Sequence, residues 1–229
     1  METRVTLAAM DSIAPQNIAN ADALGATLAD AIVAIEGAGI DYLLIGGLAI
    51  VALGRLRHSK DIDLLVRPED ARAALDALGA AGFETKDVNA MWIFKAFRQE
   101  LQVDVIFKLR GDIYLDEEML RRSVVETYKG SRVRIAPPED LIVIKALTHD
   151  EETPRHWHDA LALIARGGLD WDYILRRAVK GPRRVLSLLH YATSLDLLVP
   201  LGPLTELSAL VLDPEAGVGH EKRRERLSS

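Results

Sequence analysis

The stretch from Tyr42 to Val66, YLLIGGLAIVALGRLRHSKDIDLLV, constrains the fold of this chain most strongly. Its apolar start predicts a short buried strand that ends in a tight turn at Gly46-Gly47. LAIVALG then predicts a short helix, and DIDLLV predicts a second strand. Because side chains at positions i and i+2 of a strand point to the same face, Asp61 and Asp63 should project together. This order of elements predicts a mixed α/β core with a pair of acidic side chains at one strand.

Two carboxylates on one face repel each other, and burial would drive at least one of them to protonate. A bound Mg²⁺ would remove this cost, since hard cations prefer oxygen ligands. Asp104 is the lone charge in LQVDVIF and becomes a third candidate ligand if that strand lies beside the first. Three carboxylates could hold two metal ions, which can clamp an in-line phosphoryl displacement. The alternative is a solvated strand end, or ion pairs of the two aspartates with Arg57 and Lys60.

The rest of the chain divides into two parts. A helix is predicted from about Asn20 to Gly37, and another begins at Pro68. MWIFKAFR and LQVDVIF predict a hairpin across QE, DEEMLRRS predicts a helix, and VVETYKGSRVRIA predicts a hairpin that turns at KG. We therefore expect an α/β (α+β) fold: a small mixed sheet with flanking helices over residues 20–136. Helical patterns dominate afterwards, which predicts a helical C-terminal part over residues 137–229.

Composition excludes several classes of protein. The 229 residues carry a net charge of −6 and include no cysteine, so disulfides and thiolate metal sites are excluded. No apolar run is long enough to span a membrane, and no secretory signal is visible, so a cytoplasmic protein is expected. The negative charge argues against coating nucleic acid by bulk charge. A local basic cluster still precedes the acidic strand, at Arg55, Arg57, His58 and Lys60, and the C-terminal EKRRER is expected to be a solvated tail.

The stretch IGGLAIVALGRLRHSKDIDLLV resembles the signature of the DNA polymerase β-like nucleotidyltransferase superfamily, with thirteen residues between Gly47 and Asp61. It is most similar to the AbiEii/MenT-type nucleotidyltransferases, many of which are toxins of bacterial toxin–antitoxin pairs. The likeness covers roughly residues 40–165. Asp-x-Asp also occurs in glycosyltransferases, but the chain before this motif is too short for their nucleotide-binding domain.

By this resemblance, Asp61 and Asp63 would be metal ligands, and Asp104 would be the third ligand or the base for the incoming hydroxyl. Gly46 and Gly47 would hold the triphosphate.

The resemblance also implies that Lys145 contacts phosphate and that Asp159 positions Lys145 or the acceptor. The alternatives are a lysine that extends from a buried helix to solvent, and an aspartate paired with Arg155 one helical turn earlier. Ser59 could touch the nucleotide phosphates if it shares the strand face of Asp61, or it could be an ordinary residue at the strand entry.

Lys95 and Glu100 have the spacing of a middle motif of the AbiEii group, or they are plain hairpin residues. His156 and His158 cannot share a zinc ion on one helix, because positions i and i+2 point in different directions, so both are expected at the surface.

The implied reaction is Mg²⁺-dependent transfer of a nucleoside monophosphate from an NTP to an acceptor hydroxyl, with two ions expected and Mn²⁺ as a substitute. The acceptor would be a tRNA 3′ end, a protein or a small antibiotic, and a cognate antitoxin would be a partner if the chain is a toxin. The alternative is a non-catalytic protein on the same fold, which binds a nucleotide or a partner as an antitoxin or regulator.

Overall fold

The computed structural model describes residues 15–55, 57–150, 152 and 154–212. The EKRRER tail and the end of the expected helical part, after residue 212, lie outside these described residues. In the described part of the chain, no helix is long and apolar enough to cross a membrane.

A mixed β-sheet forms the centre of the described fold, with the strand order β3-β4-β5-β2-β1-β7-β6. The strand pairs β2–β5 and β1–β7 are parallel, and the other neighbours are antiparallel. The strands are β1 (Tyr42–Ile45), β2 (Asp61–Val66), β3 (Glu84–Asn89), β4 (Ile93–Arg98), β5 (Leu101–Ile106), β6 (Val124–Tyr128) and β7 (Ser131–Ile135). The expected mixed sheet is therefore confirmed.

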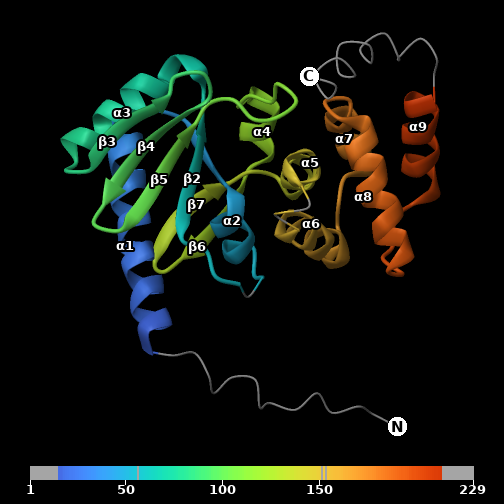
Figure 1. The fold of residues 1–229 in the computed structure, drawn as a ribbon, viewed down its shortest axis with the longest axis horizontal. Coiled ribbons are helices and arrows are strands. Elements are labelled where there is room, and N and C mark those ends of the chain that lie inside the picture. Colours follow the sequence, from blue (N-terminus) through green and yellow to red (C-terminus); the bar gives the residue numbers. More distant parts are fainter. Residues whose placement is uncertain (1–14, 56, 151, 153, 213–229) are drawn as a thin grey trace.

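Helices flank this sheet on both sides (Figure 1). Two of them, α1 and α3, pack against each other and against the strands, while α2 and α4 lie on the other side, next to the stacked helices α5 to α9. The helices are α1 (Pro15–Gly37), α2 (Gly46–Ala52), α3 (Ala71–Ala80), α4 (Glu117–Arg122), α5 (Pro138–Thr148), α6 (Arg155–Arg166), α7 (Trp171–Ala178), α8 (Pro182–Ser194) and α9 (Leu201–Leu212).

Local sequence explains most of these elements. All four residues of β1 are buried, as expected for a short apolar strand in the middle of a sheet. Both predicted hairpins are present, with two-residue turns at Gln99-Glu100 and Lys129-Gly130. Lys129 and Gly130 both have positive φ, the conformation that suits the twist of a tight hairpin.

Two helix boundaries and one strand differ from the expectations. Helix α1 begins at Pro15 rather than near Asn20, because a proline is well tolerated in the first turn of a helix. Pro68 opens a single 3₁₀ turn (Pro68–Asp70) before α3 begins. Strand β3 was not predicted, since all its residues are exposed and its sequence ETKDVN does not alternate.

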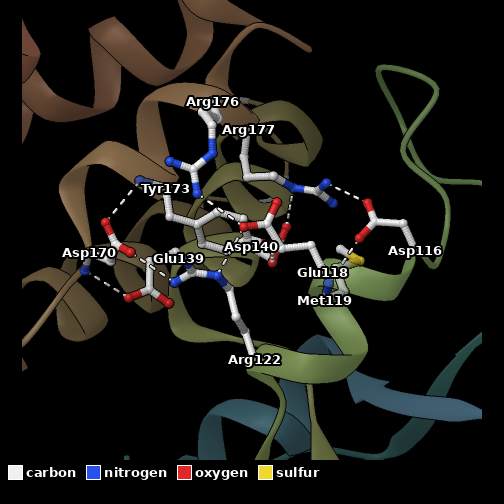
Figure 2. Close-up of polar contacts among 10 residues, drawn as sticks. All are labelled: Asp116, Glu118, Met119, Arg122, Glu139, Asp140, Asp170, Tyr173, Arg176 and Arg177. Atoms are coloured by element: carbon white, nitrogen blue, oxygen red, sulfur yellow. Dashed lines mark hydrogen bonds and ion pairs between the residues drawn. The ribbon is translucent and has the colours of Figure 1, made fainter.

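A polar cluster joins the sheet part of the chain to the helical part (Figure 2). Arg177 on α7 donates to Asp140 on α5 and to Asp116, whose side chain also caps α4. The buried hydroxyl of Tyr173 donates to Asp140 over 2.6 Å, and the Arg122 guanidinium of α4 lies 4.2 Å from the centre of the Tyr173 ring. These contacts fix α4 against α5 and α7.

Candidate functional site

The twin-glycine turn lies directly against the acidic strand. Gly46 follows β1 with a φ of 67°, and a Cβ atom at this position would overlap the Asp63 carboxylate. A Cβ on Gly47 would collide with the guanidinium of Arg57 and would lie 2.6 Å from Ser59 Oγ. Residues larger than glycine would therefore displace side chains of the site at both positions.

The sheet register brings the three predicted carboxylates to neighbouring strands. Asp63 on β2 is paired with Asp104 on β5, and Asp61 is paired with Gln102. Paired residues on adjacent strands project to the same face, so all three carboxylates share one face of the sheet. Asp61 is exposed, Asp63 is partly buried and Asp104 is buried.

This crowding changes the protonation of the buried acids. Burial and the adjacent charge of Asp104 raise the pKa of Asp63 to about 6, although Lys145 opposes the shift. Burial also raises the pKa of Asp104, and Lys95 opposes that shift. Oxygen donors whose negative charges destabilise one another are suited to a hard divalent cation.

The side chains are only partly arranged for a metal ion. Within the described residues, no group of three or more histidine and acidic side chains forms a ready metal site. Asp61 and Asp63 both open into a pocket, so this pair fits a divalent cation. Asp104 as the third ligand stays a prediction.

Asp104 is held by the strand on its other side. Lys95 on β4 is its cross-strand partner, and Lys95 Nζ lies 2.8 Å from Oδ1 and 3.1 Å from Oδ2. Gln102 Nε2 also donates to Oδ1 over 2.8 Å. Lys95 thus belongs to the site, whereas Glu100 is an exposed residue of the hairpin turn.

A buried aspartate of α6 gathers three cations. Asp159 is fully buried and pairs with Arg55, with Arg57 at 3.0 Å and with Lys145 at 3.0 Å. The alternative partner Arg155 instead lines the pocket. The arginines come from the loop after α2, so Asp159 ties this loop to the helical part of the chain.

Lys145 is 4% exposed, on a helix that is buried on nearly all sides. Burial lowers the pKa of Lys145, and Asp159 opposes the shift. The resemblance implied that Asp159 positions Lys145 or the acceptor, but the pairing of Arg55 and Arg57 with the same aspartate was not predicted.

A pocket of about 480 Å³ lies between the sheet part and α5–α6. Gly46, Gly47, Ser59, Asp61 and Asp63 line its sheet side. Besides Thr148, its other polar lining is basic or imidazole, namely Arg57, His58, Lys60, Lys145, Arg155 and His156.

The structure changes the basis of one expectation about this pocket and contradicts another. Ser59 lies in the loop before β2 rather than in the strand, so the strand alternation does not apply; its side chain still reaches the pocket, and its contact with the phosphates stays a prediction. His156 was expected at the surface, but it lines the pocket half-buried; burial, Lys145 and Arg155 lower its pKa to about 4. His158 is exposed, as expected.

Comparisons with known proteins bear on this site. A family model described as an uncharacterised nucleotidyltransferase matches residues 3–195, which is most of the chain. No match was found among curated proteins.

Solved structures resemble the fold. A solution structure of the antibiotic-resistance factor ANT(2″)-Ia is 17% identical and has a TM-score of 0.50, covering 74% of this chain and 97% of that chain. A crystal structure of ANT(2″)-Ia in complex with adenylyl-2″-tobramycin is 18% identical with a TM-score of 0.50, over 69% of this chain and 97% of that chain. The lincomycin-bound lincosamide antibiotic adenylyltransferase LnuA is 15% identical with a TM-score of 0.45, covering 60% of this chain and 94% of that chain. At these identities the likeness to ANT(2″)-Ia shows a shared fold alone.

Proposed function

The chain belongs to this nucleotidyltransferase family, and we propose that it transfers a nucleoside monophosphate from an NTP to an acceptor hydroxyl with the help of a divalent cation. Family membership agrees with the superfamily and the enzyme class expected from the sequence. The closer likeness to the AbiEii/MenT group remains part of the proposal.

One observation carries this proposal: a single pocket is lined by the glycine turn, by the acidic pair and by a buried lysine. Gly46 leaves room for the Asp63 carboxylate, so the turn and the acids are built as one unit. Lys145 faces them from α5. A nucleoside triphosphate needs a cation near its phosphates and cationic groups for its leaving pyrophosphate, and the pocket offers a place for both.

Each side chain has a role in this reaction. Asp61 and Asp63 would hold Mg²⁺, or Mn²⁺ in its place. The bound ion would neutralise negative charge on the phosphates. Gly46 and Gly47 allow the triphosphate to approach the backbone, and Ser59 lies within reach of the same phosphates. Asp104 would orient the acceptor hydroxyl and take its proton, or bind metal.

The basic groups would act on the leaving pyrophosphate. Lys145 would contact the triphosphate, since its ammonium is buried beside the pocket. Asp159 would position this lysine and Arg57 through their ion pairs. Fixed positive charge placed where negative charge develops is a large source of rate in such reactions.

The charge of the pocket bears on the acceptor. ANT(2″)-Ia has been solved with an adenylylated tobramycin, which is a polycationic aminoglycoside. In the present chain, Lys60, Arg155 and Arg57 line the pocket and disfavour such a cation. We therefore favour an anionic acceptor, a tRNA 3′ end, over a small cationic antibiotic, with a protein hydroxyl as the second choice. By the proposed likeness to the AbiEii/MenT group, the chain would be a cytoplasmic toxin of a toxin–antitoxin pair, with a cognate antitoxin as its partner.

A non-catalytic protein that only binds a nucleotide or a partner is the competing function. It would keep the fold but has no need for both Asp61 and Asp63 in the pocket. Pyrophosphate release separates the two functions, because binding alone releases none.

The test is to incubate the protein with each radiolabelled NTP, Mg²⁺, and total cellular RNA or protein. We expect pyrophosphate release and label in one acceptor fraction for the wild type, and neither for Asp61→Ala. Asp76→Ala, on the exposed face of α3, is the matched control and should behave as the wild type. Equal labelling by wild type and Asp61→Ala would refute the assigned site.

A further inference from the structure

Lys95 lies in the row of acids that the sheet presents to the pocket side. Resting on the proposed function, we propose that the Lys95 ammonium takes the place of a second divalent cation, so that this site binds a single metal ion at Asp61 and Asp63. Lys95 is then a positioning residue for Asp104 rather than a plain residue of the hairpin.

The contacts of Asp104 carry this inference. Lys95 Nζ touches both of its carboxylate oxygens, at 2.8 and 3.1 Å, and Gln102 Nε2 adds a third donor at 2.8 Å. The side chains of Lys95 and Asp104 are only 23% and 11% exposed, so water screens this pair weakly. A divalent ion bound to either oxygen would lie close beside this ammonium, and the two positive charges would repel each other.

The backbone keeps Lys95 in this place. It occupies the middle of β4, paired with Asp104 on one side and with Lys86 of β3 on the other. Lys86 lies on the same face, but its ammonium pairs with Glu84 at 3.0 Å, whereas Lys95 is the lysine that contacts Asp104. A strand held on both sides cannot withdraw its side chain without disturbing the sheet.

Charge balance points the same way. Before the nucleotide binds, three carboxylates are balanced by one ammonium and one divalent ion. A second divalent ion at Asp104 would either place a like charge beside a largely buried lysine or force that lysine to leave its carboxylate, which strands a charge in a poorly hydrated place.

Mn²⁺ binding tests this inference without relying on turnover. Electron paramagnetic resonance would be recorded during Mn²⁺ titrations of the full chain with equimolar α,β-methylene NTP, using each of the four bases. Two ions about 3.5–4 Å apart would give an exchange-coupled spectrum, and a single ion would not. The variants are Lys95→Met, the charge-preserving Lys95→Arg, and Lys86→Met as the matched control on the neighbouring strand.

We expect one bound Mn²⁺ and no coupled signal for the wild type, Lys95→Arg and Lys86→Met, and a second, coupled Mn²⁺ for Lys95→Met. A coupled pair in the wild type, or an unchanged single ion in a folded Lys95→Met, would overturn the inference while leaving the proposed function intact. Absence of Mn²⁺ binding from the wild type with every nucleotide would instead overturn the proposed function, and this inference with it.

Discussion

Replacing Asp159 by asparagine should destabilise the protein more than any surface change, because this carboxylate is the shared partner of three cations. The side chain of Asp159 is fully buried, and its substitution keeps the shape but removes the negative charge. Two of the partners can recover water, since the side chains of Arg55 and Arg57 are 32% and 18% exposed. The side chain of Lys145 is only 4% exposed and cannot recover water in this way.

The expected loss follows from this difference. Breaking a buried ion pair by removing one partner costs about 3–5 kcal/mol, since the remaining charge stays buried without compensation. Only Lys145 is left in that position, and the asparagine oxygen can still accept one hydrogen bond. We therefore expect the free energy of unfolding to fall by about 3 kcal/mol.

Urea denaturation at neutral pH, followed by circular dichroism, would measure this loss. The double variant Asp159→Asn/Lys145→Met should lose less than the sum of the two single variants by about 1–3 kcal/mol, because it no longer buries an unpaired charge. Asp112→Asn, which breaks an exposed pair with Lys108, is the control and should match the wild type. Strict additivity, or a loss below about 1 kcal/mol for Asp159→Asn, would refute the reasoning.

Three further changes test other parts of the structure. Gly46→Ala should cost about 1–3 kcal/mol of stability, measured by urea denaturation, from strain at its positive φ; it should also abolish pyrophosphate release by displacing the Asp63 carboxylate. Tyr173→Phe removes the hydrogen bond to the buried Asp140. It should lower the free energy of unfolding, measured by urea denaturation, by about 1–3 kcal/mol, and calorimetry should show unchanged nucleotide binding. His156 stays neutral in the folded protein because its pKa is lowered from 6.5 to about 4. Between these two pH values only the unfolded chain gains the proton, so stability should be lost as the pH falls from 6.5 toward 4. His156→Gln should reduce this acid loss by about 1 kcal/mol in urea titrations at about pH 7 and pH 5, and equal losses in both proteins would contradict the assignment.

Local patterns were sufficient for most of the fold. A short apolar strand, two turn dipeptides and the helical patterns after Pro137 each agree with the elements found. Strand β3 shows where local patterns are insufficient. Its residues are all exposed, all but Val88 are polar, and it is a strand only because β4 offers it an edge to pair with. Pairing with a distant edge is a tertiary property that a window of sequence does not contain.

The candidate site likewise has features that the sequence predicts and features that depend on tertiary structure. The shared face of Asp61 and Asp63 follows from strand geometry alone, and their proximity to Asp104 needed only the guess that β2 and β5 are neighbours. The partners of the charges were not predictable. Arg55 and Asp159 are far apart in sequence, and their pairing depends on how the loop after α2 meets α6.

Both parts of the chain contribute to one pocket, so a boundary near residue 136 would separate chain segments rather than independent functions. The sheet supplies the acids and the glycine turn, while α5 and α6 supply Lys145, Arg155 and His156. The ion pairs of Asp159 cross this boundary to Arg57, and they order the loop that immediately precedes the acidic strand. A sheet part alone would therefore keep its carboxylates but lose the cations that face them and the anchor of its own loop. For a reaction that brings a triphosphate next to carboxylates, that loss removes the share of the positive charge that α5 and α6 supply for the approach of the substrate.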